Sequence, residues 1–431
     1  MTRTLPTLAT LLFASTLRAA AAADAPLTAQ SRATVLDAIV DRLKSTYVDI
    51  DAAPRIEKAL RTRQQSGAYD ALSNPAQFAE VVTQDLRSIN GDLHLNLHYS
   101  NEPPPAPGRG GVGPFSDPRS LNFGMGRAEI LDGNVGYLEI TGFTGGDYQG
   151  AVVDALRFLS RTDATILDVR RNPGGASDMS HFIFSHFLPE KPVPTINVFS
   201  RSSSAPTRRM SLGDVPGPRR TDVPLFVLTS QGTASAAEEF SFVLKNKHRA
   251  TIVGTRTAGA GHMVAQIPIG SGFTVSLSIT RVTDPDSGRE WEQVGVQPDL
   301  AVAPEQALGA AHLAALKVIA ASTSDTARAH LLQLLIETVE ARAHVAPGAP
   351  ARLASLSGVY GGRVVSVRDG RLWYARRNGA LSEPLVSLSG DLYALGSMRL
   401  RFTTVGGRTT LTLEPADGTK IALGRDSAPP A

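Results

Sequence analysis

Between residues 122 and 280, short apolar runs of strand length alternate with amphipathic segments of helical period. Each apolar run is followed by a turn and then by a segment whose apolar residues recur every three or four positions. This alternation predicts an α/β core with short connections. Strands are expected at 135–140, 164–169, 225–229, 250–253 and 272–280, and helices at 148–159, 177–187 and 235–246.

Two regions of different character flank this core. Apolar residues recur at helical spacing from residue 24 to about residue 90, and Asn74-Pro75 provides an N-cap followed by proline at the first helical position. Helices are expected again over 312–342, with a break near 322–325. The chain after residue 347 contains the turn pairs Asp369-Gly370, Gly406-Gly407 and Asp417-Gly418 between β-rich runs, which predicts antiparallel hairpins.

The first 23 residues have the layout of a secretory signal peptide. Arg3 precedes an apolar run from Leu5 to Leu17, and Ala21-x-Ala23 is a small-residue cleavage site. A buried N-terminal helix is the alternative, but the run is too short to span a bilayer and ends in the processing pattern. No later stretch reaches membrane length. We therefore expect an exported protein without a membrane span, in the periplasm, with secretion as the alternative.

The amino-acid composition excludes several kinds of site and partner. The 431 residues include no Cys, which excludes disulfides, thiolate metal sites and a cysteine nucleophile. The formal net charge of +3 is too small for this length to argue for a nucleic-acid partner.

Two segments place small residues where a strand turns into a helix. Ser235 follows the strand at 225–229 and begins a helix, so its hydroxyl and the backbone N–H of Ala236 both lie at the helix N-terminus, which suits a developing oxyanion. The alternative is that Ser235 only caps the helix. Asn172-Pro173-Gly174-Gly175 follows the strand at 164–169, and its glycines allow backbone N–H groups to approach a carbonyl. An ordinary turn with positive φ is the alternative there.

Two further segments carry titratable side chains. In the run Gly91-Asp92-Leu93-His94-Leu95-Asn96-Leu97-His98, alternation places Asp92, His94 and His98 on one face of a strand. A zinc site is a possibility, but the sequence shows no other cluster that would complete it, and a structural histidine is the plainer interpretation. The turn-rich segment 284–299 contains two acids, Glu290 and Glu292, on either side of Trp291. A solvated loop over a packed tryptophan is the alternative.

Taken together, these four segments resemble the tail-specific or C-terminal processing serine peptidases. The best match is the branch that includes the tricorn core protease and the interphotoreceptor retinoid-binding protein repeats. The resemblance rests on Asp-Val-Arg-x-Asn-Pro-Gly-Gly from Asp168, Thr-Ala-Ser-Ala-Ala-Glu-Glu from Thr233 and Gly-Val-Gln-Pro-Asp from Gly295, in family order. It covers about residues 90–305 and implies a ClpP/crotonase-like α/β catalytic core.

The resemblance also implies roles for individual residues. Ser235 would be the nucleophile, and Gly174, Gly175 and Ala236 would form the oxyanion hole. Ala260 stands where the bacterial processing peptidases have a general-base lysine, so a Ser-Lys dyad requires Lys245 or Lys247 instead. In the tricorn-like branch the base is a histidine and the third member a glutamate, which correspond to His94 and Glu292; His262 and Glu290 are the second choices.

These observations predict a serine endopeptidase that cleaves exported or unfolded polypeptides through an acyl-enzyme, with no cofactor and no metal. We expect an N-terminal helical bundle (24–105), an α/β catalytic domain (106–305), a helical connection (306–346) and a β-rich C-terminal domain (347–431). Two alternatives remain: a non-catalytic module that binds a small apolar ligand, and an esterase or amidase with the same triad. The substrate sequence, the oligomeric state and the role of the β-rich domain stay open.

Overall fold

The computed structural model describes residues 26–100, 118–201, 203, 205–344, 348–376 and 382–426 of the chain. The predicted signal peptide, residues 1–23, therefore lies outside the described residues, and so does the predicted boundary at residues 105 and 106. None of the helices in the described residues combines the length and the hydropathy needed to cross a bilayer.

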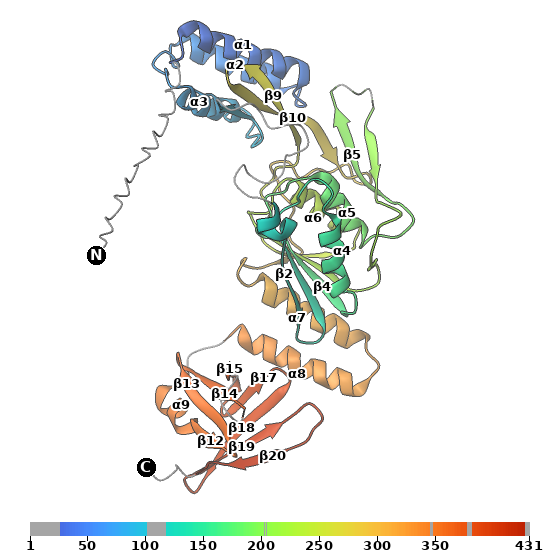
Figure 1. Cartoon of the computed structure of the whole chain (residues 1–431), viewed down its shortest axis with the longest axis vertical. Helices are drawn as coiled ribbons and strands as arrows, with labels where there is room; N and C mark the ends of the chain where they lie inside the picture. Colours follow the sequence, from blue (N-terminus) through green and yellow to red (C-terminus); the bar gives the residue numbers. More distant parts are fainter. Residues whose placement is uncertain are drawn as a thin grey trace, which may run out of the picture.

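Three helices form one end of the molecule, as the helical spacing predicts (Figure 1). Thr28 and Asn74 cap the first and third of them, because their side chains accept backbone N–H bonds from the first turn. The helices share one apolar core with the strands β1, β9 and β10. The elements are α1 (Ala29–Thr46), α2 (Ala52–Gln65), α3 (Pro75–Arg87), β1 (Asn96–Tyr99), β9 (Met263–Gly270) and β10 (Phe273–Thr283).

Strand β10 connects this end to the rest of the molecule, because it pairs antiparallel with β1, β9 and β5. The sheet order is β1-β10-β5-β6, with β9 paired to β10 beside this path. The remaining strands are β5 (Pro194–Ser200), which lies between β10 and β6, and the edge strand β6 (Thr207–Met210).

A six-stranded sheet of order β11-β8-β7-β4-β3-β2 forms the centre of the α/β core. Its strands are parallel except for β2, which pairs antiparallel with β3. The bounds are β2 (Met125–Leu131), β3 (Val135–Ile140), β4 (Ala164–Asp168), β7 (Leu225–Thr229), β8 (Thr251–Gly254) and β11 (Leu300–Ala301), with the 3-10 segment η1 (Pro118–Gly124) before β2.

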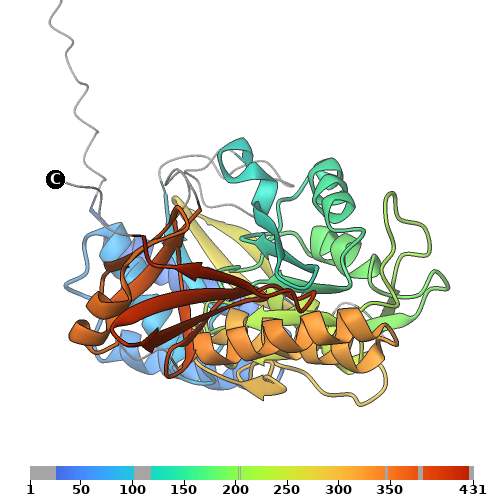
Figure 2. The same ribbon diagram turned by 90° about the horizontal axis from the view of Figure 1, so that it is seen from below.

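Helices cover both faces of this sheet, because alternate apolar residues of each central strand point to opposite sides. One face packs against α4 (Gln149–Phe158), α5 (Ser177–Ser185) and α6 (Ala236–Asn246). The other packs against α7 (Ala307–Ser322) and α8 (Thr326–Arg342), which lie side by side in Figure 1; Figure 2 shows this end of the molecule from below. The predicted α/β class and the predicted break near 322–325 are confirmed.

The C-terminal segment is built from antiparallel strands, which confirms the predicted hairpins at Asp369-Gly370, Gly406-Gly407 and Asp417-Gly418. Its two sheets share an apolar core with α9. The elements are α9 (Pro350–Leu356), β12 (Gly358–Tyr360), β13 (Arg363–Arg368), β14 (Arg371–Ala375), β15 (Ser382–Pro384), β16 (Val386–Ser389), β17 (Leu392–Leu395), β18 (Met398–Val405), β19 (Arg408–Glu414) and β20 (Ile421–Gly424).

Candidate active site

Ser235 lies on a strained turn between β7 and α6. Its backbone has φ of 53° and ψ of −123°, a left-handed conformation that a residue with a side chain adopts at a cost. A serine on a sharp strand-to-helix turn of this kind presents its hydroxyl at the edge of a sheet, as nucleophilic serines do. The side chain is half-buried. The predicted helix therefore begins immediately after Ser235.

The strained backbone is held by Glu238, one turn into α6. A carboxylate oxygen of Glu238 accepts the backbone N–H of Ser235 at 3.0 Å. The same carboxylate accepts N–H bonds from Gly259 and Ala260, both at 2.7 Å, and a hydroxyl bond from Thr257 at 2.5 Å. Burial raises the pKa of Glu238, and these four bonds partly oppose the rise. Glu238 thus fixes the serine turn to the loop that carries residues 257–262.

The loop Gly174-Gly175 lies directly against this turn. Gly174 has φ of 104°, and a methyl group on it would lie 2.8 Å from the Ser235 Cβ, so only glycine fits. The Gly174 N–H is already bonded to Asn172 Oδ1 at 2.8 Å. By contrast, among the described residues nothing accepts the N–H groups of Gly175 and Ala236. These two N–H groups are the donors available to a substrate oxyanion.

His94 lies in a turn rather than on a strand, which corrects the sequence prediction. Asp92 accepts the backbone N–H of His94 at 2.9 Å through its side chain and that of Leu95 at 3.2 Å through its carbonyl. These bonds bend the chain, so β1 begins only at Asn96. His94 consequently does not share a strand face with His98, which lies exposed on β1.

Asp92 is the closest carboxylate to the His94 ring. Its Oδ1 lies 3.5 Å from His94 Nδ1, and its Oδ2 accepts hydroxyl bonds from Tyr47 at 2.9 Å and Ser278 at 2.6 Å. Burial favours the neutral acid, but the His262 and His94 side chains and Ser278 hold the pKa of Asp92 far below its usual range. Asp92 is therefore a fixed, charged group beside the imidazole. Sequence reasoning considered it only as a possible zinc ligand, although it lies in the same Gly-Asp-x-His run.

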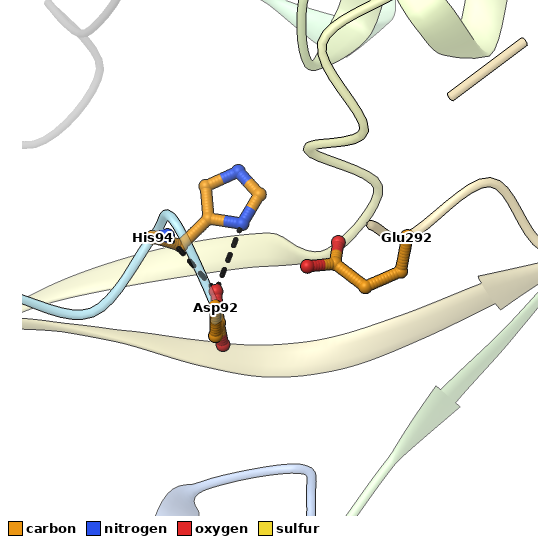
Figure 3. Close-up of side chains that lie close together, drawn as sticks. All are labelled: Asp92, His94 and Glu292. Carbon is orange, nitrogen blue, oxygen red and sulfur yellow. Dashed lines mark hydrogen bonds and ion pairs between the residues drawn. The ribbon is translucent and has the colours of Figure 1, made fainter. Parts of the chain in front are cut away.

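Glu292 faces the same place from the opposite side, as Figure 3 shows. Its Oε2 accepts the backbone N–H groups of Gly261 at 2.6 Å and His262 at 3.0 Å. Burial raises the pKa of Glu292; the positive charge on His262 opposes the rise and the charge on Asp92 adds to it. The structure thus brings His94 and Glu292 together, with carboxylate and imidazole ligand atoms of Asp92, His94 and Glu292 all within 4.8 Å of one another.

One loop connects this group to Ser235. Ala260 donates its N–H to Glu238, which holds the serine turn, and the next residue, Gly261, donates its N–H to Glu292. Within the part of the chain that the structure describes, no hydrogen bond or ion pair joins Ser235 directly to His94.

The second-choice residues have different surroundings. Glu290 pairs with Arg281 at 2.6 Å, and its side chain is 30% exposed. Lys245 and Lys247 lie at the far end of α6, where they pair with Asp299 and Asp286. Lys245 comes ten positions after Ser235, which corresponds to about 15 Å along the helix.

His262, in contrast, lies within the same group as His94. Its Nδ1 is 3.9 Å from Asp92 Oδ2 and 3.9 Å from Glu292 Oε2. Burial lowers the pKa of His262, but the two carboxylates raise it overall.

Comparisons with known proteins find similarity in the central part of the chain. The profile of peptidase family S41 matches residues 134–302. A carboxyl-terminal-processing protease of Synechocystis is 31% identical over 169 residues, which are 38% of this chain and 37% of that protein. A carboxy-terminal-processing protease of Bartonella bacilliformis is 30% identical over 178 residues, which are 40% of this chain and 39% of that protein.

Among solved structures, a lipoprotein of Streptococcus agalactiae aligns over 67% of this chain and 96% of its own, with 17% identity and a TM-score of 0.47. The chain thus spans about two fifths of the curated relatives that it matches. The match includes Gly174, Ser235 and Glu292 but not His94. The α/β core of the chain, residues 134–302, is therefore similar to peptidase family S41.

Proposed function

We propose that this chain is a serine peptidase that hydrolyses exported or unfolded polypeptides through an acyl-enzyme. The observation that carries the proposal is the strained Ser235 at the start of α6, with the free N–H groups of Gly175 and Ala236 beside it. A nucleophile next to two unpaired backbone donors is the arrangement that acyl transfer requires. The family assignment of residues 134–302 supports the same reaction class.

His94 acts as the general base in this mechanism. Its Nδ1 faces Asp92, so Nε2 is the nitrogen left to accept the Ser235 hydroxyl proton. The serine oxygen attacks the peptide carbonyl carbon, and the carbonyl oxygen becomes an oxyanion stabilised by the Gly175 and Ala236 N–H groups. His94 then returns the proton to the leaving amine, and water hydrolyses the acyl-enzyme by the same route. Hydrogen bonds between a nucleophile and its base often tighten only when substrate is bound.

Two carboxylates assist the imidazole in this proposal. Glu292 is the third member of the triad, and Asp92 adds a second negative charge at 3.5 Å from Nδ1. A carboxylate beside a catalytic histidine fixes the tautomer and stabilises the imidazolium that forms.

A cavity of about 450 Å³ next to Gly175 suits a substrate side chain. It is lined by residues 144–146, Gln149 and residues 176–179, which directly follow the glycine loop. A larger cavity of about 1270 Å³ lies at the other end of α6, where its lining includes Lys245 and Asp286. We assign the smaller cavity to the substrate, because only its lining is continuous with an oxyanion donor.

Labelling with a fluorophosphonate tests the proposal, since this reagent reacts covalently with activated serines. Mass spectrometry of the labelled protein should place the adduct on Ser235, and Ser235→Ala should abolish both labelling and peptide turnover. Ser241→Ala is a matched control, because Ser241 lies buried within α6. Turnover of p-nitrophenyl esters without peptide turnover would favour the esterase alternative. A folded protein that neither labels nor turns over either substrate would contradict the enzyme proposal.

We also propose that residues 1–23 direct export and are removed, and that the β-rich domain begins near residue 347. Amino-terminal sequencing of native protein should begin near Asp24; an intact Met1 would contradict export. A chain that ends near residue 345 should still label at Ser235. If it is folded but unlabelled, the β-rich domain contributes to the site.

A further inference from the structure

Four titratable side chains from three separate segments meet in one buried group. Asp92 and His94 come from the turn before β1, His262 from the loop before β9, and Glu292 from the loop after β10. Side-chain exposure is 1% for Asp92, 12% for His94, 11% for His262 and 7% for Glu292. We call this group the carboxylate–imidazole cluster.

Three atoms of this cluster have no hydrogen-bond partner although they are buried. They are Nδ1 of His94, Nδ1 of His262 and Oε1 of Glu292. Buried polar atoms are rarely left unpaired, because each loses its bonds to water without replacement. A cation can bind all three atoms when each imidazole carries its proton on Nε2 and the carboxylate is ionised.

The spacing of the cluster suits one small cation. A tetrahedral zinc centre with bonds of about 2.1 Å holds its ligand atoms about 3.4 Å apart. His94 Nδ1 lies 3.5 Å from Asp92 Oδ1, and His262 Nδ1 lies 3.9 Å from an oxygen of Asp92 and of Glu292. The ligand atoms of Asp92, His94 and Glu292 all lie within 4.8 Å of one another, so shifts of up to about 1.4 Å would bring them to tetrahedral spacing, with His262 as the outermost member of the set. Two nitrogens and two carboxylate oxygens are a ligand set that binds Zn²⁺ and related divalent ions.

Hydrogen bonds hold the carboxylates of Asp92 and Glu292 in place, as is usual for carboxylates that bind metal ions. Tyr47 and Ser278 donate hydroxyl bonds to Asp92, and the backbone N–H groups of Gly261 and His262 bond to Glu292. Outer hydrogen bonds of this kind orient ligands and maintain their charge. The two carboxylates raise the pKa of His262, so a divalent cation would bind in place of that proton, and with both imidazoles neutral it would balance the charge of −2 on the carboxylates.

We propose that Asp92, His94, His262 and Glu292 bind one divalent transition-metal ion of the zinc class, and that the bound ion inhibits the peptidase. A neutral imidazole that binds metal through Nδ1 carries its proton on Nε2. His94 then has no lone pair to accept the Ser235 proton, so the base is blocked while Ser235 itself is untouched. Binding is independent of the proposed function, whereas inhibition rests on it.

Metal binding is measured first in Ser235→Ala, which has no peptidase activity to confuse the result. Titration with Zn²⁺ in a calorimeter should show one site of micromolar affinity or tighter, and Co²⁺ should give the intense visible absorption of a tetrahedral centre. In this background Glu292→Gln and His262→Ala should each weaken Zn²⁺ binding by more than about tenfold, and Tyr47→Phe by about 10–100-fold. His98→Ala is the matched control and should bind as well as its parent.

Inhibition is then measured in the wild-type chain, where Zn²⁺ should stop peptide turnover and a chelator should restore it. Binding weaker than millimolar in folded Ser235→Ala, or equal binding by folded Glu292→Gln and His262→Ala, would overturn the metal site. Tight binding with undiminished turnover would overturn the inhibition. If the wild-type chain shows no turnover at all, the proposed function fails, while the titration of Ser235→Ala still decides the metal site.

Discussion

Replacing Gly174 by alanine should disable the active site more than it destabilises the fold. The added methyl would lie 2.8 Å from the Ser235 Cβ and the Ala234 carbonyl oxygen, whereas ordinary contact begins at 3.4 Å. Relieving both contacts requires a shift of about 0.6 Å, and Ser235 lies on the side that must move. Misplacement of a nucleophile by about 1 Å costs about 100-fold in rate. We expect a loss of about 10–100-fold in kcat/KM and in fluorophosphonate labelling.

The same substitution also has a stability cost with two sources. A residue with a Cβ at a φ of 104° costs about 1–2 kcal/mol, and overpacking costs about 1–3 kcal/mol more. Gly270→Ala separates these sources, because Gly270 has a similar φ of 92° but nothing within 4 Å of an added methyl. Gly270→Ala should therefore lose about 1–2 kcal/mol of unfolding free energy and keep its full rate of labelling.

Urea unfolding and labelling kinetics of the two variants provide the measurement. If folded Gly174→Ala labels Ser235 at the wild-type rate, the glycine loop does not shape the nucleophile turn and the assignment of the oxyanion donors is wrong. Equal rate losses in both variants would show that backbone strain, and not contact with Ser235, is responsible.

Three further outcomes can be checked with simple variants. His94→Ala should reduce turnover by several orders of magnitude while His98→Ala retains it, as peptide assays on folded protein will show. Lys245→Ala should keep full activity and lose at most about 1 kcal/mol in urea unfolding, because its surface ion pair is remote from Ser235. Burial favours the neutral form of Asp168, but Arg170 and Tyr137 lower its pKa overall. The charged side chain therefore stabilises the fold above the unfolded pKa of about 3.9. That contribution is lost as the pH falls through the lower folded pKa. The stability difference between the wild type and Asp168→Asn should accordingly shrink below about pH 4, and a difference that grows on acidification would contradict this sign.

Much of the fold could be predicted from the sequence, because it depends on patterns among residues that are neighbours along the chain. The strand at 135–140 is apolar except for Glu139, since it is buried on both faces, and the observed β3 has those bounds. The turn pairs in the C-terminal segment likewise determine their hairpins from neighbouring residues alone. The strand expected around His94 was wrong because alternation of leucines over 93–97 does not reveal that the Asp92 side chain bonds the backbone N–H of His94.

The carboxylate–imidazole cluster depends on contacts that the sequence does not display. Asp92 and Glu292 are 200 positions apart, and they meet because β1 pairs with β10, which places the turn before β1 next to the loops on either side of the β9–β10 hairpin. The Gln293 side chain fastens this arrangement by bonding the Asn90 carbonyl, while its backbone N–H bonds Gly259 at 2.7 Å. Gln293 has a φ of 59°, so the segment after Glu292 is strained in the same way as the serine turn.

Strain at both Ser235 and Gln293 is maintained by hydrogen bonds to one loop, residues 257–262. Adjacent backbone N–H groups of that loop bond Glu238 on the serine side and Glu292 on the histidine side. Ala260, at the position where the resemblance leads one to expect a lysine base, supplies one of these N–H groups and is buried, with 8% exposure. In the proposed mechanism this loop therefore supplies no base of its own, and its backbone N–H groups instead fasten Glu238 beside the serine and Glu292 beside the histidine.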